Sequence, residues 1–495
     1  MSRERTYDAE IICGELTIKN VPCEINFPDV TRESIKIKIE STDKDLYILS
    51  TKPYFSLKAD VHNVAQEKTA SIEAVRIYID SYETLFDGKK NTFFIEGTPD
   101  ELSMIHFKGK HKIPSDILEG NNYSKTIKYP KLAFIIDRVP IITPFSLPRI
   151  NHFGEVLIES ENPLNVNISD DFQIEFQQFY TAESDSSKIE LRPYLVVSIN
   201  ADSLTSSEFV LKKEFFYNKL EDVLHLVSFV QNEKVNWLQW SFEDDDVMIM
   251  TYRGNVRPLK ELKADSKLHW IIEKSDVCTF IETAFYNFHN GSYKTPLIGA
   301  IYTLNSGSGM PVETYFMALF QSLESIVGIN KKMNGGEFVL SQNKWRILRK
   351  DIEVAIKSSS DVNMGKDDRR KMYNKLNELN RVSFKDAYIS FSKDFKFHTT
   401  SPWPLFDEDG CVGLISIRNM LAHGDSFPTD ITTPLFIAGE CLALLLREVI
   451  FNVVGWKNYD INKNVYNAPR IRFDKTFVQD CKQDFKDYYD LLNGK

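Results

Sequence analysis

Hydrophobic and polar residues alternate over the first two hundred positions in the manner of β-strands. Between Ile35 and Ile39 an isoleucine occupies every second position, which buries one face of the segment and leaves the other in water. Clusters of Gly, Pro, Asn and Asp separate such runs, as turns require. The predicted strands are 34–40, 71–79, 92–96, 131–136, 155–159, 172–176 and 195–199. Short strands at this spacing predict a sandwich or a barrel-like sheet.

The pattern changes to a helical one after about two hundred residues. Apolar side chains recur at intervals of three and four between Leu220 and Val230, which predicts a helix. A β-hairpin is expected over 235–251, with the acidic run 243–246 between its arms. We interpret that run as a solvated turn in preference to a metal site. Residues 271–288 are expected to be helical again.

A segment rich in Gly and Ser at 305–309 is the candidate hinge before a different kind of sequence. Pro311 suits the first turn of a helix, and the apolar positions from Phe316 to Val327 fall on one helical face. Further helices are predicted around 372–379, over 384–395 behind a capping box at Ser383 to Asp386, over 413–422 and over 434–454. The last 190 or so residues are therefore typical of a helical bundle.

These patterns predict an α+β protein with a β-rich N-terminal region followed by an all-α bundle. The expected domains are a β-rich region at 1–215, a mixed α/β extension at 216–304, the bundle at 311–455 and a C-terminal tail at 456–495. We expect the β-rich region to act as a sensor or a regulator of the bundle.

The charge of the chain excludes one class of protein. The 495 residues carry a formal net charge of −10. Residues 1–300 contribute about −12 and residues 301–495 about +2. A protein that holds nucleic acid tightly over a large surface has a strongly basic footprint, which this chain lacks. Any contact with nucleic acid must therefore be local or transient.

Cysteine usage, the N-terminal residues and one interrupted apolar stretch lead us to expect a cytoplasmic protein. The six cysteines form no C-x-x-C pair, so they are expected to be thiols in a reducing compartment. The charged N-terminal residues lack the apolar core of a signal peptide. The apolar stretch 434–455 contains Glu440, Arg447 and Glu448, so we interpret it as a buried helix and not as a membrane span.

Most familiar catalytic motifs are missing from the sequence. It contains no phosphate-binding G-x-x-x-x-G-K-[ST] loop, no G-x-G-x-x-G, no H-E-x-x-H and no G-x-S-x-G. The histidines have no ligand spacing, so we expect no metal and no cofactor.

One hexapeptide, Arg418-Asn-Met-Leu-Ala-His423, carries candidate chemistry. On a helix Asn419 and His423 lie within about 40° of each other, and the long Arg418 side chain can reach the same space. Gly424 is a natural helix stop, which places His423 near a C-terminus.

These three residue types suit metal-independent cleavage of RNA, whose own 2′-hydroxyl is the nucleophile. An imidazole can take the hydroxyl proton or supply one to the leaving 5′-oxygen, a guanidinium can brace two phosphate oxygens, and an amide can orient either group. One histidine cannot readily be both acid and base in one step. Two copies of Arg418, Asn419 and His423 across a two-fold axis would supply both.

Judged from the sequence pattern alone, structural capping or a solvated surface explains the hexapeptide as well as catalysis does. His398 could approach from the preceding loop, although we interpret it as a surface residue.

The helical region resembles the HEPN superfamily, whose active members carry R-x4-6-H, commonly beginning Arg-Asn, just before a long final helix. Arg418, Asn419 and His423 match that motif. The whole sequence resembles ApeA-type anti-phage defence proteins, to which Gly14-Glu-Leu-Thr17 and Phe320-Gln-Ser-Leu-Glu324 add weaker matches.

The resemblance implies a metal-independent endoribonuclease that is active as a HEPN homodimer and stops growth during phage infection (abortive infection). It implies RNA as substrate, with tRNA or rRNA as candidates, 2′,3′-cyclic phosphate ends and a phage-derived trigger. The charges within 434–455 lead us to expect no membrane partner. Catalysis is expected from Arg418, Asn419 and His423. Glu324 is the candidate partner of Arg418, or alternatively a polar residue on the wet flank of its helix. Two alternatives stay open: a non-enzymatic HEPN dimer that binds RNA or a protein, and an interaction scaffold with an inert helical tail.

Overall fold

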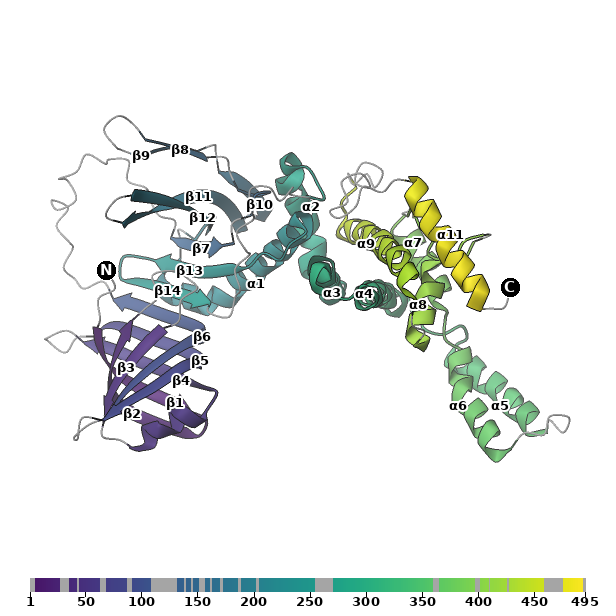
Figure 1. Cartoon of the computed structure of the whole chain (residues 1–495), viewed down its shortest axis with the longest axis horizontal. Coiled ribbons are helices and arrows are strands. Elements are labelled where there is room, and N and C mark those ends of the chain that lie inside the picture. Colours follow the sequence, from purple (N-terminus) through teal and green to yellow (C-terminus); the bar gives the residue numbers. More distant parts are fainter. Residues whose placement is uncertain are drawn as a thin grey trace. The chain divides into compact units, whose positions relative to one another are not determined.

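The computed structural model describes most of the chain and divides it into two compact units (Figure 1). The β-rich unit contains residues 1–227, 234–267 and 273–282, and the helical unit contains residues 228–233, 268–272 and 283–495. The described residues are 5–26, 35–41, 44–62, 68–86, 91–107, 131–137, 139–143, 146–150, 156–160, 163–169, 172–185, 188–201, 204–253, 270–358, 365–396, 401–408, 410–424, 427–457 and 475–492.

Six antiparallel strands close a barrel at the start of the β-rich unit. They pair in the order β6-β3-β2-β1-β4-β5, and β5 pairs with β6 to complete the ring. The strands are β1 (Arg5–Cys13), β2 (Leu16–Asn26), β3 (Ile35–Ser41), β4 (Tyr54–His62), β5 (Lys68–Phe86) and β6 (Asn91–Phe107). In β3 the alternation seen in the sequence places Ile35, Ile37 and Ile39 inside. Closure leaves this part of the sheet without a free edge.

Beyond the barrel the twelve-stranded sheet continues from the far half of β6, and we call this part the second sheet. Residues 101–107 of β6 pair with β14, and the order continues β14-β13-β7-β12-β11-β10. Its strands are β7 (Leu132–Ile136), β10 (Leu164–Ser169), β11 (Phe172–Asp185), β12 (Lys188–Ile199), β13 (Trp237–Glu243) and β14 (Val247–Arg253). A separate two-stranded sheet joins β8 (Ser146–Ile150) to β9 (Val156–Ser160).

Helix α1 (Ser206–Gln231) packs on the second sheet through aromatic rings. Phe209 stacks on Phe242 of β13 with 4.4 Å between ring centroids, and Tyr217 lies 5.8 Å from Trp237. Rings of this size bury large apolar areas, which fixes the helix to the sheet.

The predicted acidic run forms the turn between β13 and β14. Asp244 accepts backbone N–H groups from Asp246 at 3.0 Å and Val247 at 2.8 Å, and a third from Ser206 at 2.7 Å. Partial burial opposes ionisation, but the hydrogen bonds to these three amides prevail and lower the pKa of Asp244. The run is a turn whose first aspartate caps backbone donors.

The helical unit is built around α9 (Thr432–Val454), which is buried along almost its whole length. Helices α3, α4 and α11 pack against α9, and α7 and α8 pack against α4 (Figure 1). The helices are α2 (Val277–Asn290), α3 (Lys294–Ser306), α4 (Val312–Met333), α5 (Gln342–Ser358), α6 (Lys366–Leu379), α7 (Phe384–Asp394), α8 (Leu414–His423), α9 and α11 (Lys475–Leu492). Short 3-10 helices are η1 (Lys44–Thr51), η3 (Lys274–Asp276), η4 (Gly307–Gly309) and η5 (Thr429–Ile431).

The predicted fold class is confirmed, because a β-rich N-terminal region precedes a helical C-terminal region. The compact helical unit is larger than the predicted bundle of 311–455, since it takes in α3 and the end of α2. The predicted hinge at 305–309 contains the end of α3 and η4. In the predicted tail, α11 buries Val478, Cys481 and Phe485 against the bundle.

Local predictions in the helical unit can be compared with the structure. The Ser383 hydroxyl accepts the Asp386 backbone N–H at 3.1 Å, so the expected N-terminal cap of α7 is present. Glu440, Arg447 and Glu448 are buried in α9, as predicted for the charges of that stretch. Among the described residues no helix meets the length and apolarity that a membrane crossing requires. All six cysteines lie in described parts of the chain and are free thiols.

Candidate functional site

Helix α8, which carries the hexapeptide, is anchored at its N-terminus by a loop from the preceding segment. The Asp407 carboxylate accepts the Gly413 backbone N–H at 2.7 Å and the Ser416 hydroxyl at 2.8 Å. The Leu414 N–H donates to the carbonyl of Pro404 at 3.0 Å. The first N–H groups of a helix have no partner within it, so these bonds satisfy them and fix where α8 begins.

The other end of α8 is closed by Gly424, as the sequence predicts. Gly424 has a φ of 87°, and its N–H donates to the carbonyls of Met420 and Leu421. This left-handed conformation favours glycine and ends the helix at His423. Because Ile417 and Met420 are buried, the helix is fixed in rotation, and its polar residues face away from the core.

Arg418 forms an ion pair with Glu324 across two helices. Its Nη2 lies 3.2 Å from one carboxylate oxygen of Glu324 and 3.3 Å from the other. Both side chains are about one-third exposed, at 32% and 33%. The pairing that the resemblance implied for Glu324 is thus the contact found in the structure.

Two further contacts orient the Arg418 guanidinium. Its Nη1 donates to Oδ1 of Asn419 at 3.2 Å, and its central carbon lies 5.8 Å from the ring centroid of Phe320. Phe320 stands one turn before Glu324 on α4 and is buried. A carboxylate, an amide and an aromatic face therefore hold one planar cation, an arrangement that suits Arg better than Lys.

His423 is exposed at the end of α8, one turn beyond Asn419. Helical geometry puts these two residues within about 40° of each other. In the described part of the chain, no hydrogen bond or ion pair joins His423 to Arg418, Asn419 or Glu324. The structure thus brings Arg418, Asn419 and Glu324 into contact and leaves the imidazole open to solvent. His398 lies outside the described residues.

The arrangement has a limited chemical repertoire within one chain. It offers one exposed imidazole for proton transfer and one guanidinium for binding an anion, the latter partly neutralised by Glu324. Among the described residues no group of three or more His, Cys, Asp or Glu side chains is placed to hold a metal ion. A phosphate approaching Arg418 would compete with the Glu324 carboxylate for the same N–H donors.

Sequence reasoning missed two residues that shape the site. The apolar spacing of its helix predicts a core position for Phe320 and gives no sign of its contact with Arg418. Asp407 lies six residues before Gly413, beyond the reach of any local capping pattern. The sequence shows an aspartate upstream of the Gly that begins the helix. The contact between them depends on the fold of the intervening loop, which the sequence pattern does not predict.

Known proteins give no further indication of what these side chains do. No family model matches the chain, and neither a curated protein nor a solved structure matches it.

Proposed function

We propose that this chain is a metal-independent endoribonuclease that acts in the cytoplasm in anti-phage defence. One observation carries the proposal: Arg418 is oriented by Glu324 and Asn419 on the helix that ends in the exposed His423. A fixed guanidinium and a free imidazole are the groups that transesterification of RNA needs. The resemblance of the hexapeptide to the HEPN motif supports the same function.

The reaction follows from these groups. One imidazole removes the proton of the ribose 2′-hydroxyl, and the resulting oxygen attacks the adjacent phosphorus. The P–O5′ bond breaks, and a second imidazole, already protonated, gives its proton to the leaving 5′-oxygen. The products are a 2′,3′-cyclic phosphate and a 5′-hydroxyl. Arg418 stabilises the negative charge that builds on the phosphoryl oxygens, and Asn419 orients the guanidinium.

The second imidazole comes from a second copy of the chain in this proposal. Each chain supplies one exposed histidine at the end of α8, and two-fold symmetry would place two such ends in one cleft. Glu324 keeps Arg418 in place until a phosphate displaces the carboxylate. The β-rich unit would sense a phage-derived trigger and release this activity.

The test is incubation of the purified protein with total RNA, tRNA and rRNA in the presence of a chelator, followed by mapping of the cleaved ends. Wild type should yield cyclic-phosphate ends, and His423→Ala and Arg418→Ala should each abolish them. Arg381→Ala is the matched control, since Arg381 is an exposed arginine of the helical unit that lies outside both α8 and the α5–α6 hairpin. Cleavage by the His423→Ala protein would remove the assignment. RNA binding without cleavage by wild type would favour the non-enzymatic dimer.

A further inference from the structure

The hairpin of α5 and α6 concentrates positive charge in an acidic protein. Residues 342–379 include ten basic and six acidic side chains, a net charge of +4, whereas the rest of the chain carries −14. This charge of +4 exceeds the net charge of about +2 on residues 301–495, so the rest of that region is net negative. Such local charge is the kind of footprint through which an otherwise acidic protein can attract a polyanion.

The hairpin is joined to the helix that carries Glu324. At its base the backbone N–H of Val339 donates to the Asn380 carbonyl at 2.8 Å, and Leu340 N–H donates to the Asn380 side chain at 2.7 Å. Lys331, near the end of α4, donates to the Val382 carbonyl at 2.7 Å. From Glu324 to the end of α4 is about 14 Å along the helix axis. The hairpin therefore follows α4 directly, and α4 is the helix whose Glu324 pairs with Arg418.

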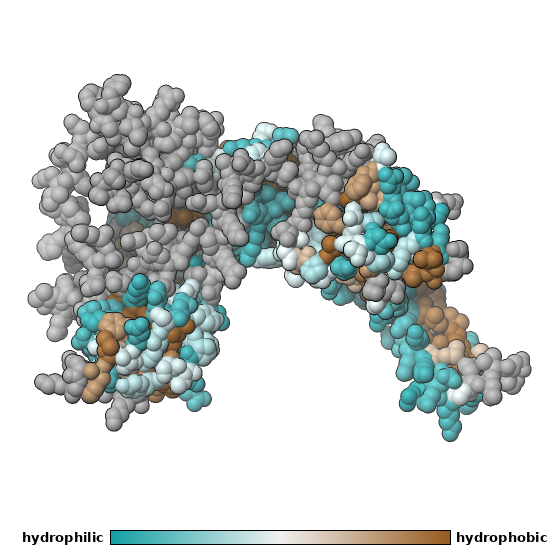
Figure 2. Space-filling view, viewed as in Figure 1, coloured by the Kyte–Doolittle hydropathy of each residue, from teal (hydrophilic) through white to brown (hydrophobic). Residues whose placement is uncertain are grey.

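Contacts between the two helices define which faces of the hairpin are free. Helices α5 and α6 pack against each other, and the buried residue of α5 is Ile356 and that of α6 is Leu376. Across the pair, Nη1 of Arg349 donates to Oδ1 of Asn377 at 2.7 Å. Figure 2 shows hydrophilic side chains along one side of the hairpin and hydrophobic ones toward another.

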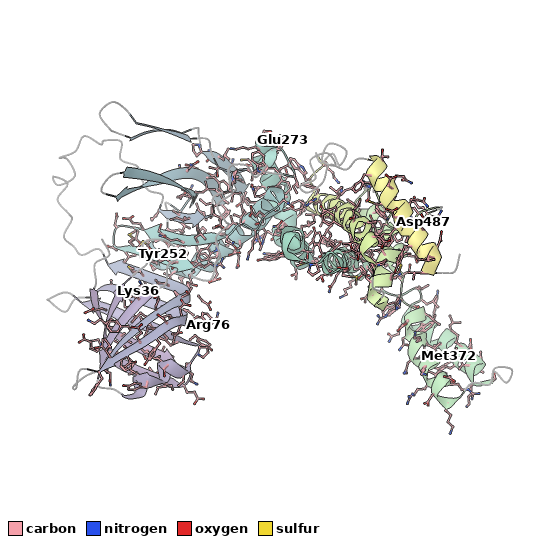
Figure 3. All side chains as sticks on the ribbon, in the orientation of Figure 1. Lys36, Arg76, Tyr252, Glu273, Met372 and Asp487 are labelled. Carbon is pink, nitrogen blue, oxygen red and sulfur yellow. The ribbon has the colours of Figure 1, made fainter. Side chains whose placement is uncertain are left out.

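Basic residues of both helices share one of these faces. Arg346, Lys350 and Lys357 lie about 100° around α5 from Ile356, and Lys366 and Arg370 lie about 100° around α6 from Leu376. Because the helices are antiparallel, both rotations lead to the side on which Arg349 meets Asn377. We call Arg346, Lys350, Lys357, Lys366 and Arg370 the basic face. Met372, labelled in Figure 3, lies on α6 outside it.

Most of the cations of the hairpin have no carboxylate partner in the part of the chain that the structure describes. Arg349 pairs with Glu353 at 2.7 Å, and Arg370 lies 3.6 Å from Asp367. The eight others form no ion pair with any described residue: Lys344, Arg346, Lys350, Lys357, Lys366, Arg369, Lys371 and Lys375. All members of the basic face are exposed. Exposed cations along a helix of about 25 Å match the repeating charge of a nucleic-acid backbone.

We propose that the basic face binds the sugar-phosphate backbone of a structured RNA and thereby delivers it to Arg418 and His423. This inference rests on the proposed function for the identity of the polyanion. It names the substrate class as RNA with several ordered nucleotides beyond the cleaved bond, because a dinucleotide at His423 could not also reach the hairpin. Phosphate contacts of this kind position RNA and carry no sequence preference.

The experiment measures binding of a fluorescent stem-loop RNA to full-length protein by anisotropy, in a chelator and over a series of salt concentrations. All variants carry His423→Ala so that no cleavage occurs. The test variant adds R346Q, K350Q and K357Q. The matched control adds K344Q, K371Q and K375Q, which remove equal charge from exposed positions of the same two helices outside the basic face. Circular dichroism and size-exclusion chromatography verify the fold and oligomeric state of each protein.

We expect the test variant to bind at least about ten-fold more weakly and its salt slope to fall by about 2, whereas the control stays within about two-fold. Equal weakening by both triples, or by neither, would overturn the proposal. A change of oligomeric state in the test variant alone would also overturn it and assign the face to a protein contact. Binding is scored without cleavage, so a failure of the nuclease assignment would appear separately.

Discussion

Glu324 of α4 and Arg418 of α8 lie 94 positions apart in the sequence, yet the carboxylate oxygens of one are 3.2 Å and 3.3 Å from Nη2 of the other. The pair is about one-third exposed, so its contribution to stability is small, at about 0–1 kcal/mol. Its main effect is to fix the direction of a guanidinium beside the exposed end of α8.

Replacing the carboxylate of Glu324 tests this positioning role. We expect Glu324→Gln to lower the cleavage rate by about ten-fold, because the guanidinium loses its charged partner and its orientation. The melting temperature should change little, since the pair is partly exposed. The check is a kinetic assay alongside a thermal melt. Unchanged cleavage would mean that Glu324 is only a polar residue on the wet flank of α4.

Arg418→Lys separates charge from geometry. Lysine keeps the positive charge but loses the planar fork that contacts Glu324, Asn419 and the Phe320 ring. We expect it to lose at least about a hundred-fold in cleavage rate, close to the loss for Arg418→Ala. Single-turnover rates on one RNA measure the difference. Near-normal activity in the lysine variant would show that a point charge is sufficient.

Asp407→Ala tests how α8 is anchored. Loss of the bonds to Gly413 and Ser416 should destabilise the helical unit by about 1 kcal/mol, a typical value for an N-terminal cap. Chemical denaturation measures the change. Asp367→Ala is the control, because Asp367 is 82% exposed on α6 and should have almost no effect. Equal destabilisation by the two variants would remove the capping role.

The fold was largely predictable because its elements follow local periodicity. Alternating isoleucines predict β3, and apolar residues spaced three and four apart predict α4. Closure of the barrel was not predictable in this way, since it depends on pairing between β5 and β6 along their length. Helix α11 buries Val478, Cys481 and Phe485 where the sequence predicts only a tail, because their spacing of three and four residues extends over a single helix.

Only the part of the candidate site that lies on one helix could be predicted from local sequence. A short local pattern showed Arg418, Asn419 and His423, because all three lie on one helix. Glu324 followed only from a family resemblance, as no local signal links residues on separate helices. The contact with Phe320 depends on how α4 packs against α8, which a single sequence does not encode locally.

Glu448 gives the helical unit a pH dependence. Desolvation by burial in α9 raises the pKa of Glu448 to about 7, and its Oε2 has no hydrogen-bond partner among the described residues. The folded state therefore holds a proton that the unfolded state releases near pH 4.5. Stability from this group is complete below that pH and declines as the pH rises toward 7.

We accordingly expect Glu448→Gln to raise the melting temperature by about 2–4 °C at pH 8, the shift that ~1 kcal/mol produces in a unit of this size. Near pH 5 the gain should be much smaller. Thermal melts of both proteins at the two pH values provide the measurement. A gain that is independent of pH would contradict the raised pKa.

Mixing wild-type and His423→Ala subunits tests the central claim most directly, because that claim requires one imidazole from each of two chains at the reacting phosphate. The two proteins are combined in equal amounts, allowed to exchange subunits, and assayed for RNA cleavage at constant total protein. If each site needs both histidines, only pairs of wild-type chains are active, and the rate falls to about one quarter of the wild-type value. A rate of about one half would show that each chain cleaves RNA with its own histidine, which would contradict the composite site.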